Sequence, residues 1–146
     1  MGWAAEAKGR MVFMGKGEDV CVFCEKATKS DSAQFFGTSG TVFAVKDRFP
    51  VTELHILVIP YRHVDTVFDM SGQETADAWQ LVKTVRKMLL GQDSSIVGFN
   101  VGVNCGASAG QTVPHAHIHV IPRRAGDTHD PAGGVRGAVP GMRRYR

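Results

Sequence analysis

The chain has 146 residues, of which 43% are hydrophobic and 21% charged, and a formal net charge of +3. This length suits one ordinary domain, and the composition excludes a disordered or fibrous chain. No run of about 18 or more apolar residues exists, and the chain start lacks the basic-then-apolar pattern of a signal peptide, so we expect a cytoplasmic protein without membrane spans.

Composition divides the chain into three parts. Residues 1–19 show little periodicity and several glycines, which indicates a loosely ordered lead-in. Residues 20–128 carry the patterned domain, and residues 129–146 form an arginine-rich tail. Residues 122–146 contain six arginines and two aspartates, so this end has a net charge of +4. The rest of the chain is nearly neutral. A localised positive end suits an anionic ligand or nucleic acid, or it is a solvated tail that keeps the protein soluble.

Two strands and a helix are predicted in the first part of the domain. Residues 41–45 and 55–59 are short β-rich runs, with Pro50 in the turn between them. A capping box from Ser71 to Glu74 then begins a helix, and Gly91 is placed to end it. The apolar residues between these two points recur at helical spacing: Ala78, Leu81, Val82, Val85 and Leu89.

The second part alternates apolar and polar residues. Residues 97–103 have the period of a strand with one buried face, residues 104–110 form a loop of small side chains, and residues 113–122 again have a period of two. Helices and strands do not follow strict β-α-β alternation. We therefore expect an α+β fold with a mainly antiparallel sheet.

Three histidines alternate along the last predicted strand. Side chains at i, i+2 and i+4 of a strand share a face, so His115, His117 and His119 are expected to project to one side. Burying three imidazoles together costs free energy unless each finds a hydrogen-bond partner, a metal or a ligand. A single histidine would be interpreted as a structural residue, whereas three alternating histidines indicate a catalytic or ligand-binding site. Either a metal takes all three, as in hydrolytic zinc sites, or one ring is a nucleophile while its neighbours hold an anion.

Two other segments bear on that choice. The loop from Asn104 to Thr112 offers small residues, backbone amides able to surround an oxyanion, and amide and hydroxyl side chains, which is typical of a phosphate cradle. Cys21 and Cys24 are separated by two residues, and the chain has three cysteines in all. An odd count with so close a pair does not resemble a secreted disulfide framework, so the pair indicates thiolate chemistry or a metal. A redox pair or two buried small residues are the alternatives.

These residues resemble a known family. Asn104-x-Gly106 followed by residues 110–123, Gly-Gln-Thr-Val-Pro-His-Ala-His-Ile-His-Val-Ile-Pro-Arg, is similar to the signature of the histidine-triad (HIT) superfamily, H-φ-H-φ-H-φ-φ with φ apolar. Asp47, eight residues before His55, and the run from His55 to His63 extend the match. The resemblance covers Cys21 to about Asp127. Residues 123–127 and 133–136 are similar to bacterial members of the branch that includes the fragile-histidine-triad dinucleoside polyphosphate hydrolases.

The resemblance implies a fold and an activity. The fold is the HIT-like α+β domain, an antiparallel sheet of about five strands with one long helix and a short one, which dimerises into a continuous sheet with the helix at 71–90 near the interface. The activity is that of a nucleotide hydrolase or transferase that cleaves at the α-phosphate through a nucleotidyl-histidine intermediate. Dinucleoside polyphosphates rank first as substrates, and purine nucleoside phosphoramidates or aminoacyl nucleotides are the alternative. A non-catalytic nucleotide-binding regulatory protein and a three-histidine metallohydrolase are rival interpretations.

The resemblance also implies roles for individual residues. His117 would be the nucleophile, with its other ring nitrogen donating to a backbone carbonyl. His119 and His55 would contact phosphate oxygens or orient that network, and Gln111 and Thr112 would hold the phosphate and the leaving-group side. No catalytic metal is implied. The expected partners are a nucleotide, purine preferred, and a second copy of the chain, and neither a membrane nor a nucleic acid is expected.

Further positions complete the predicted nucleotide-binding set. Asp47 matches the acidic residue that takes the ribose hydroxyls, and Phe23 lies where the family places an apolar contact to the base. Asn104 and Gly110 belong to the phosphate loop. Asp47 starting a turn and Phe23 lying in the core are the alternatives, because a lone Phe is more often core.

The last implied feature is a structural zinc ion. A subset of the family holds zinc with the residues that match Cys21, Cys24, His63 and His115 here, a tetrahedral two-cysteine, two-histidine set. Such a metal would brace the first triad histidine. The sequence departs from the family in two places. Leu54 stands where many members have Gly, and the C-terminal segment is short and arginine-rich. The second departure means that the resemblance does not determine the identity of the substrate.

Overall fold

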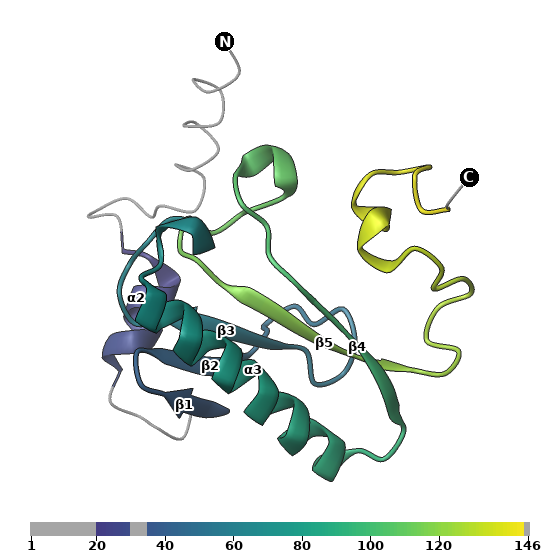
Figure 1. Ribbon diagram of the computed structural model, residues 1–146, viewed down its shortest axis with the longest axis horizontal. Helices are drawn as coiled ribbons and strands as arrows, with labels where there is room; N and C mark the ends of the chain where they lie inside the picture. The colour runs from purple at the N-terminus through teal and green to yellow at the C-terminus, as the bar shows by residue number, and fades with distance from the viewer. Residues whose placement is uncertain (1–19, 30–34, 145–146) are drawn as a thin grey trace.

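A five-stranded antiparallel sheet in the order β1-β2-β3-β5-β4 forms the centre of the protein, seen here in a computed structural model that describes residues 20–29 and 35–144 (Figure 1). The predicted lead-in at 1–19 lies outside the described residues. The predicted antiparallel α+β fold is confirmed. The strands are β1 (Gly37–Ser39), β2 (Val42–Lys46), β3 (Ile56–Pro60), β4 (Ile96–Gly102) and β5 (Ile118–Arg124).

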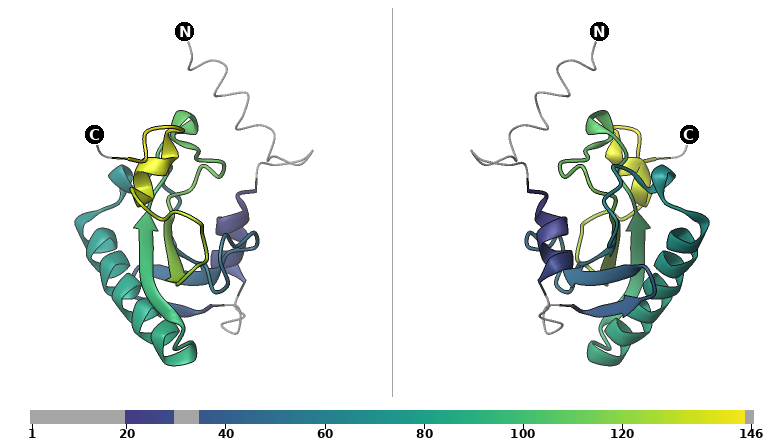
Figure 2. Two further views of the ribbon diagram at one scale, coloured as in Figure 1. Left: turned by 90° about the vertical axis from the view of Figure 1, so that its right-hand side faces the viewer. Right: turned by 90° about the vertical axis from the view of Figure 1, so that its left-hand side faces the viewer.

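Helices lie on both faces of this sheet. The long helix α3 (Gly72–Gln92) covers one face, and the short helix α2 (Val22–Thr28) lies on the other side (Figure 2). Because neighbouring residues of a strand point to opposite faces, β2 and β3 supply side chains to both cores. The core under α3 joins Ala78, Leu81, Val82, Val85 and Leu89 to alternate residues of β2, β3 and β5. The opposite core joins Phe23 to Phe43, Val45, Leu57 and Ile59.

The predicted capping box begins α3. Ser71 Oγ accepts a hydrogen bond from Glu74 N at 3.1 Å, and the Glu74 carboxylate accepts one from Ser71 N at 2.7 Å. The prediction that Gly91 ends the helix is wrong, since the helix continues through Gln92 and Asp93 N still donates to Leu89 O at 3.0 Å. Gly91 is not among the glycines with positive φ, so it stays in the helix like any other residue.

The predicted strand at 113–122 begins later than expected. Pro114 has no N–H to give to a ladder, His115 N donates to Val113 O at 2.9 Å, and Ala116 N donates to Val64 O at 2.7 Å. These backbone groups are therefore used in a turn and a loop contact before β5 starts at Ile118. As a result His115 precedes the sheet, while His119 lies in register with Leu57 of β3 and Gly102 of β4.

The arginine-rich C-terminal segment contains local structure. It includes a short 3₁₀ helix, η5 (Gly134–Ala138), which contacts β4. Arg144 pairs with Asp130 at 2.7 Å. This segment is the yellow part of Figure 1. None of the helices within residues 20–29 and 35–144 combines the length and the apolar character that crossing a bilayer requires.

Candidate active site and metal centre

His117 has one ring nitrogen engaged and one available. Its Nδ1 lies 2.8 Å from the carbonyl oxygen of His115. A carbonyl only accepts, so Nδ1 carries the proton and Nε2 of the neutral ring keeps its lone pair. The side chain is buried at 8% exposure, and burial lowers its pKa, which favours this neutral form. His117 thus has the tautomer that a nucleophilic imidazole needs.

A chain of hydrogen bonds fixes the proton on His119. The backbone N–H of Val51 donates to Nδ1 of His55 at 3.2 Å, so neutral His55 carries its proton on Nε2. That nitrogen lies 2.9 Å from Nδ1 of His119 and donates to it. Neutral His119 then carries its proton on Nε2, a buried atom with no hydrogen-bond partner among the described residues. An N–H donor is left for a ligand.

Burial keeps these two rings neutral. Together with the neighbouring rings of His117 and His55, it lowers the pKa of His119 to about 4. Burial is also the main cause that lowers the pKa of His55, against the opposing effect of Asp47. Both histidines are therefore uncharged at neutral pH, as the proton assignment requires.

Asp47 takes part in the turn that was its alternative interpretation, and its contact with the ribose hydroxyls stays a prediction. Its Oδ1 accepts a hydrogen bond from Phe49 N at 2.8 Å, which makes it part of a turn, and its Oδ2 lies 3.5 Å from Nδ1 of His55. The possible ligand atoms of Asp47, His55 and His119 lie within 4.8 Å of one another. Since the ring nitrogens that face each other in His55 and His119 are joined by a hydrogen bond, this group is a proton network.

Two glycines in the loop that is predicted to cradle a phosphate adopt positive φ angles. Gly106 and Gly110 have φ angles of +89° and +88°, in the left-handed region that favours glycine. Nothing lies within 4 Å of a Cβ built at either position, so the requirement is conformational and the space beside them is free.

Gln111 organises this loop from inside. Its Oε1 accepts from Gly106 N at 2.8 Å, and its Nε2 donates to Asp65 O at 2.6 Å and Val113 O at 3.0 Å. The predicted contact of Gln111 with phosphate therefore requires that some of these hydrogen bonds break. Thr112 is exposed and Asn104 is partly exposed, so both side chains are accessible from solvent.

Phe23 belongs to the core and borders the site. It is 6% exposed in the core opposite α3, and its ring meets the ring of His117 edge-on at 5.2 Å between centroids. The predicted core alternative is therefore correct, and the contact with a base stays a prediction.

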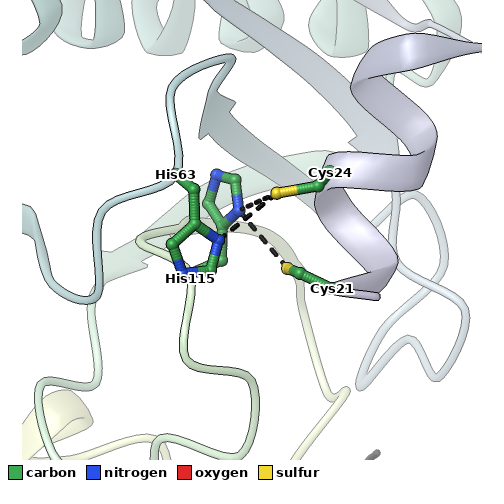
Figure 3. Close-up of side chains that lie close together, drawn as sticks. All are labelled: Cys21, Cys24, His63 and His115. Atoms are coloured by element: carbon green, nitrogen blue, oxygen red, sulfur yellow. Dashed lines mark hydrogen bonds between the residues drawn. The ribbon is translucent and has the colours of Figure 1, made fainter. Parts of the chain in front are cut away.

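The predicted metal ligands come together at the start of α2. Figure 3 shows Cys21, which directly precedes this helix, and Cys24, which lies within it, facing His63 and His115. His63 follows β3 and His115 precedes β5. Nδ1 of His115 lies 3.4 Å from Sγ of Cys21 and 3.6 Å from Sγ of Cys24, and Nδ1 of His63 lies 3.3 Å from Sγ of Cys24. Zinc–sulfur and zinc–nitrogen bonds of about 2.3 and 2.05 Å in a tetrahedron place S and N about 3.6 Å apart. The cluster has the dimensions of a zinc site.

The outer contacts of the cluster also suit a metal. Nε2 of His115 donates to Pro60 O at 2.8 Å, which leaves the Nδ1 lone pair directed at the two sulfurs. Nε2 of His63 lies 3.6 Å from Asp65 Oδ1. Ligating histidines usually donate the N–H of their other ring nitrogen to a carbonyl or carboxylate, as His115 does here. Burial, with Cys21 beside it, raises the pKa of the Cys24 thiol to about 11, so a metal would have to displace that proton.

The sequence analysis did not predict two features of the site. The Val51 donor is a backbone group, which no side-chain pattern reveals. Leu54 has a φ of +66°, the only positive φ of a non-glycine residue among the described ones, and it directly precedes His55. Here the departure from Gly at Leu54 was a usable signal, because glycine adopts this conformation without strain.

Comparisons with known proteins identify the family. The HIT domain family model matches residues 28–126. The chain is 46% identical over 81 residues to the nitrilase and fragile histidine triad fusion protein NitFhit of Caenorhabditis elegans, over 56% of this chain and 18% of that protein. It is 35% identical over 101 residues to the bifunctional bis(5'-adenosyl)-triphosphatase/adenylylsulfatase FHIT of Arabidopsis thaliana, over 68% of this chain and 54% of that protein. The chain therefore spans about half or less of these curated relatives.

A solved structure has the same fold. The crystal structure of a Zn-bound histidine triad family protein from Mycobacterium smegmatis superposes with a TM-score of 0.68 at 30% identity, over 78% of this chain and 82% of that chain. The family model covers more than half of the chain and includes the whole histidine run. The chain belongs to the HIT domain family.

Proposed function

We propose that this protein hydrolyses dinucleoside polyphosphates by attack of His117 on the α-phosphorus. The observation that carries the proposal is the hydrogen bond from Nδ1 of His117 to the carbonyl of His115, because it leaves Nε2 as the unprotonated nitrogen. The name of the Arabidopsis relative, a bis(5'-adenosyl)-triphosphatase, supports this substrate class.

The reaction has two displacements. In the first, the lone pair of His117 Nε2 forms a bond to the α-phosphorus while the bond from that phosphorus to the bridging oxygen breaks, and the leaving phosphate keeps the electron pair. In the second, a water oxygen bonds to phosphorus, the P–N bond breaks and its electron pair returns to Nε2. The proton of that water passes to solvent, and nucleoside monophosphate is released. One difficult step is thus divided into two easier ones.

His119 favours a phosphate leaving group. Its Nε2–H is a neutral donor, since burial lowers the ring's pKa to about 4. A departing phosphate with a pKa of about 6 leaves as an anion and needs only such a hydrogen bond. A departing amine, as in a phosphoramidate, must gain a proton, which a neutral imidazole supplies poorly. This difference ranks polyphosphates above phosphoramidates.

The remaining contacts are assigned by position. The free space beside Gly106 and Gly110 suits the non-bridging oxygens of the α-phosphate. Asp47, close to His55, is proposed to take the ribose hydroxyls, and Phe23 to border a purine. A homodimer stays a prediction; β4 lies at one edge of the sheet, where a second copy would extend it.

We also propose a structural zinc ion held by Cys21, Cys24, His63 and His115. Zinc would supply binding free energy to the folded state and takes no part in bond cleavage. It would fix the ring of His115, the residue whose carbonyl orients His117.

Turnover of diadenosine tetraphosphate and of adenosine 5'-phosphoramidate tests the proposal, with wild type compared with His117→Asn. We expect nucleoside monophosphate to be released from the tetraphosphate by wild type and not by the variant. Nucleotide binding without turnover of either compound by wild type would favour the non-catalytic regulatory alternative. Loss of turnover only on removal of metal, with metal found at His117 and His119, would favour the three-histidine metallohydrolase.

A further inference from the structure

The turn at residues 51–54, directly before His55, is tied to β5 by the side chain of Thr52. The Thr52 hydroxyl donates to the carbonyl oxygen of Pro122 at 2.7 Å. The ladder of backbone hydrogen bonds between β3 and β5 ends at Val120, and Pro122 has no N–H with which to continue it. The Thr52 hydroxyl therefore connects the turn to β5 beyond the point where the backbone ladder stops.

Arg124 supplies a second and longer link between the same turn and β5. Its Nη1 donates to the carbonyl oxygen of Glu53 at 3.3 Å. Its Nε and Nη2 donate to Asp93 Oδ2 at 3.0 and 2.6 Å, and these two bonds hold the guanidinium in place. Both links lead to β5, the strand that carries His119. The position of the turn is therefore fixed relative to that histidine.

Two groups that favour opposite tautomers lie beside Nδ1 of His55. The backbone N–H of Val51 donates to this nitrogen at 3.2 Å, which requires a lone pair there. Oδ2 of Asp47 lies 3.5 Å from the same nitrogen, and a carboxylate favours a proton on it. Because neutral imidazole carries one proton, only one of the two groups can be satisfied. The tautomer of His55 thus depends on how closely the turn holds the Val51 N–H.

The tautomer of His55 determines what His119 presents to a substrate. With its proton on Nε2, His55 donates to Nδ1 of His119 at 2.9 Å, and the buried Nε2 of His119 is an N–H donor. With its proton on Nδ1, His55 would accept a hydrogen bond from Nδ1 of His119 instead. Nε2 of His119 would then hold a lone pair, which repels a departing phosphate oxygen. The direction of the whole proton chain follows from the position of one turn.

We infer that Thr52 is a positioning residue, whose hydroxyl holds the Val51 N–H against His55 and thereby keeps His119 a hydrogen-bond donor. The effect on turnover rests on the proposed function, whereas the effect on the tautomers stands without it. Thr52 acts on the reaction only through this turn and the two histidines.

Nitrogen-15 NMR of the imidazole rings tests the inference, because it distinguishes protonated from unprotonated ring nitrogens. In the wild type at neutral pH, we expect the proton on Nε2 of both His55 and His119. Thr52→Val has a similar shape but no hydroxyl, so the Nδ1–H form of His55 is expected to appear. Thr52→Ser, which keeps the hydroxyl, is expected to keep the wild-type tautomers. Unchanged tautomers in Thr52→Val would overturn the inference.

Thr84→Val is the matched control for this measurement. The Thr84 hydroxyl also donates to a backbone carbonyl, that of Gln80 at 3.1 Å, but it does so within α3. Its removal is expected to leave the tautomers of His55 and His119 unchanged, and a shift as large as that in Thr52→Val would overturn the inference. Thr52→Ala repeats the test if Thr52→Val folds poorly.

Kinetics connect the tautomers to the proposed function. Since His119 is assigned to the leaving oxygen, Thr52→Val is expected to lower kcat for diadenosine tetraphosphate by about tenfold with little change in KM. Thr52→Ser is expected to stay within about twofold of wild type. A wild-type kcat in Thr52→Val despite shifted tautomers would overturn the positioning role. If the wild type shows no turnover, the NMR measurement still decides whether Thr52 sets the tautomers, so the two failures are distinguishable.

Discussion

The carbonyl oxygen of His115 accepts a hydrogen bond from Nδ1 of His117 at 2.8 Å, while the ring of His115 belongs to the cysteine and histidine cluster. One residue therefore connects the proposed zinc site to the proposed nucleophile. Both ring nitrogens of His115 are engaged, Nε2 with Pro60 O and Nδ1 beside Cys21. Occupation of the cluster is expected to hold the carbonyl on which the tautomer of His117 depends.

The first prediction concerns the metal. The purified protein is expected to contain one zinc ion per chain, and Cys24→Ser to contain little, because one thiolate ligand is lost. Zinc at 1,000 times its Kd stabilises the folded state by about 4 kcal/mol, so the loss is expected to lower the Tm by about 10 °C. Metal analysis and calorimetry measure both quantities.

Cys105→Ser is the control for this prediction, because Cys105 lies outside the cluster. It is expected to keep both the zinc content and the Tm. Equal zinc content in Cys24→Ser and wild type would contradict the assigned ligands.

The second prediction concerns the donor on His119. His119→Ala removes the only Nε2–H that we assign to the leaving oxygen, so kcat for diadenosine tetraphosphate is expected to fall by about 10²- to 10³-fold. The Tm is expected to change little by comparison. Steady-state kinetics measure the loss, and a kcat within about threefold of wild type would exclude this role.

The third prediction concerns the strained turn before His55. Leu54 has a φ of +66°, which a β-branched side chain adopts with more difficulty than leucine. Leu54→Val is therefore expected to lower the free energy of unfolding by about 1–2 kcal/mol and to lower kcat, since His55 N donates to Thr52 O in this turn.

Leu54→Gly is the matched substitution, because glycine adopts positive φ freely. It is expected to retain more of the wild-type kcat than Leu54→Val does. Denaturant unfolding and steady-state kinetics on both variants compare the two. If Leu54→Val retained the higher kcat, the turn would not position His55.

The fourth prediction concerns pH and stability. The Arg62 guanidinium holds the pKa of the buried Glu74 carboxyl at about 2, below its ordinary value of 4.5, through hydrogen bonds of 2.8 and 2.9 Å. Because the pKa is lowered in the folded state, this stabilisation is complete above pH about 4.5 and is lost as pH falls through about 2.

Glu74→Gln is expected to be less stable than wild type at pH 7, by about 1–3 kcal/mol, and the difference is expected to shrink as pH falls from 4.5 toward 2. Urea unfolding at several pH values measures it. A difference that stays constant over this range would show that the charge of Glu74 contributes nothing.

Much of the fold was readable from the sequence because hydrophobic period and capping act locally. The capping box at Ser71 and the apolar spacing from Ala78 to Leu89 predicted α3 correctly. The strand at 113–122 was predicted to begin too early, because its alternation continues through Pro114 while the backbone bonds of His115 and Ala116 go elsewhere. Periodicity describes side chains and cannot show where a ladder of backbone hydrogen bonds begins.

In the site, too, the identity of side chains could be predicted from the sequence, whereas backbone contacts could not. The family resemblance supplied the cluster of Cys21, Cys24, His63 and His115, whose members the structure brings together. The proton chain through Val51 depends on a backbone N–H, and the contact of the C-terminal segment with β4 depends on how the folded chain packs. Neither property belongs to a residue type, so composition indicated only a positive end at Arg143 and its neighbours.

Mass spectrometry of an acid-free quenched reaction tests the central claim most directly. Wild-type protein mixed with diadenosine tetraphosphate and stopped within one turnover is expected to carry one added nucleoside monophosphate on the peptide that contains residues 115–119, with fragmentation placing it on His117. His119→Ala is expected to carry the same adduct, formed more slowly. Turnover without any adduct, or an adduct on another residue, would contradict attack by His117.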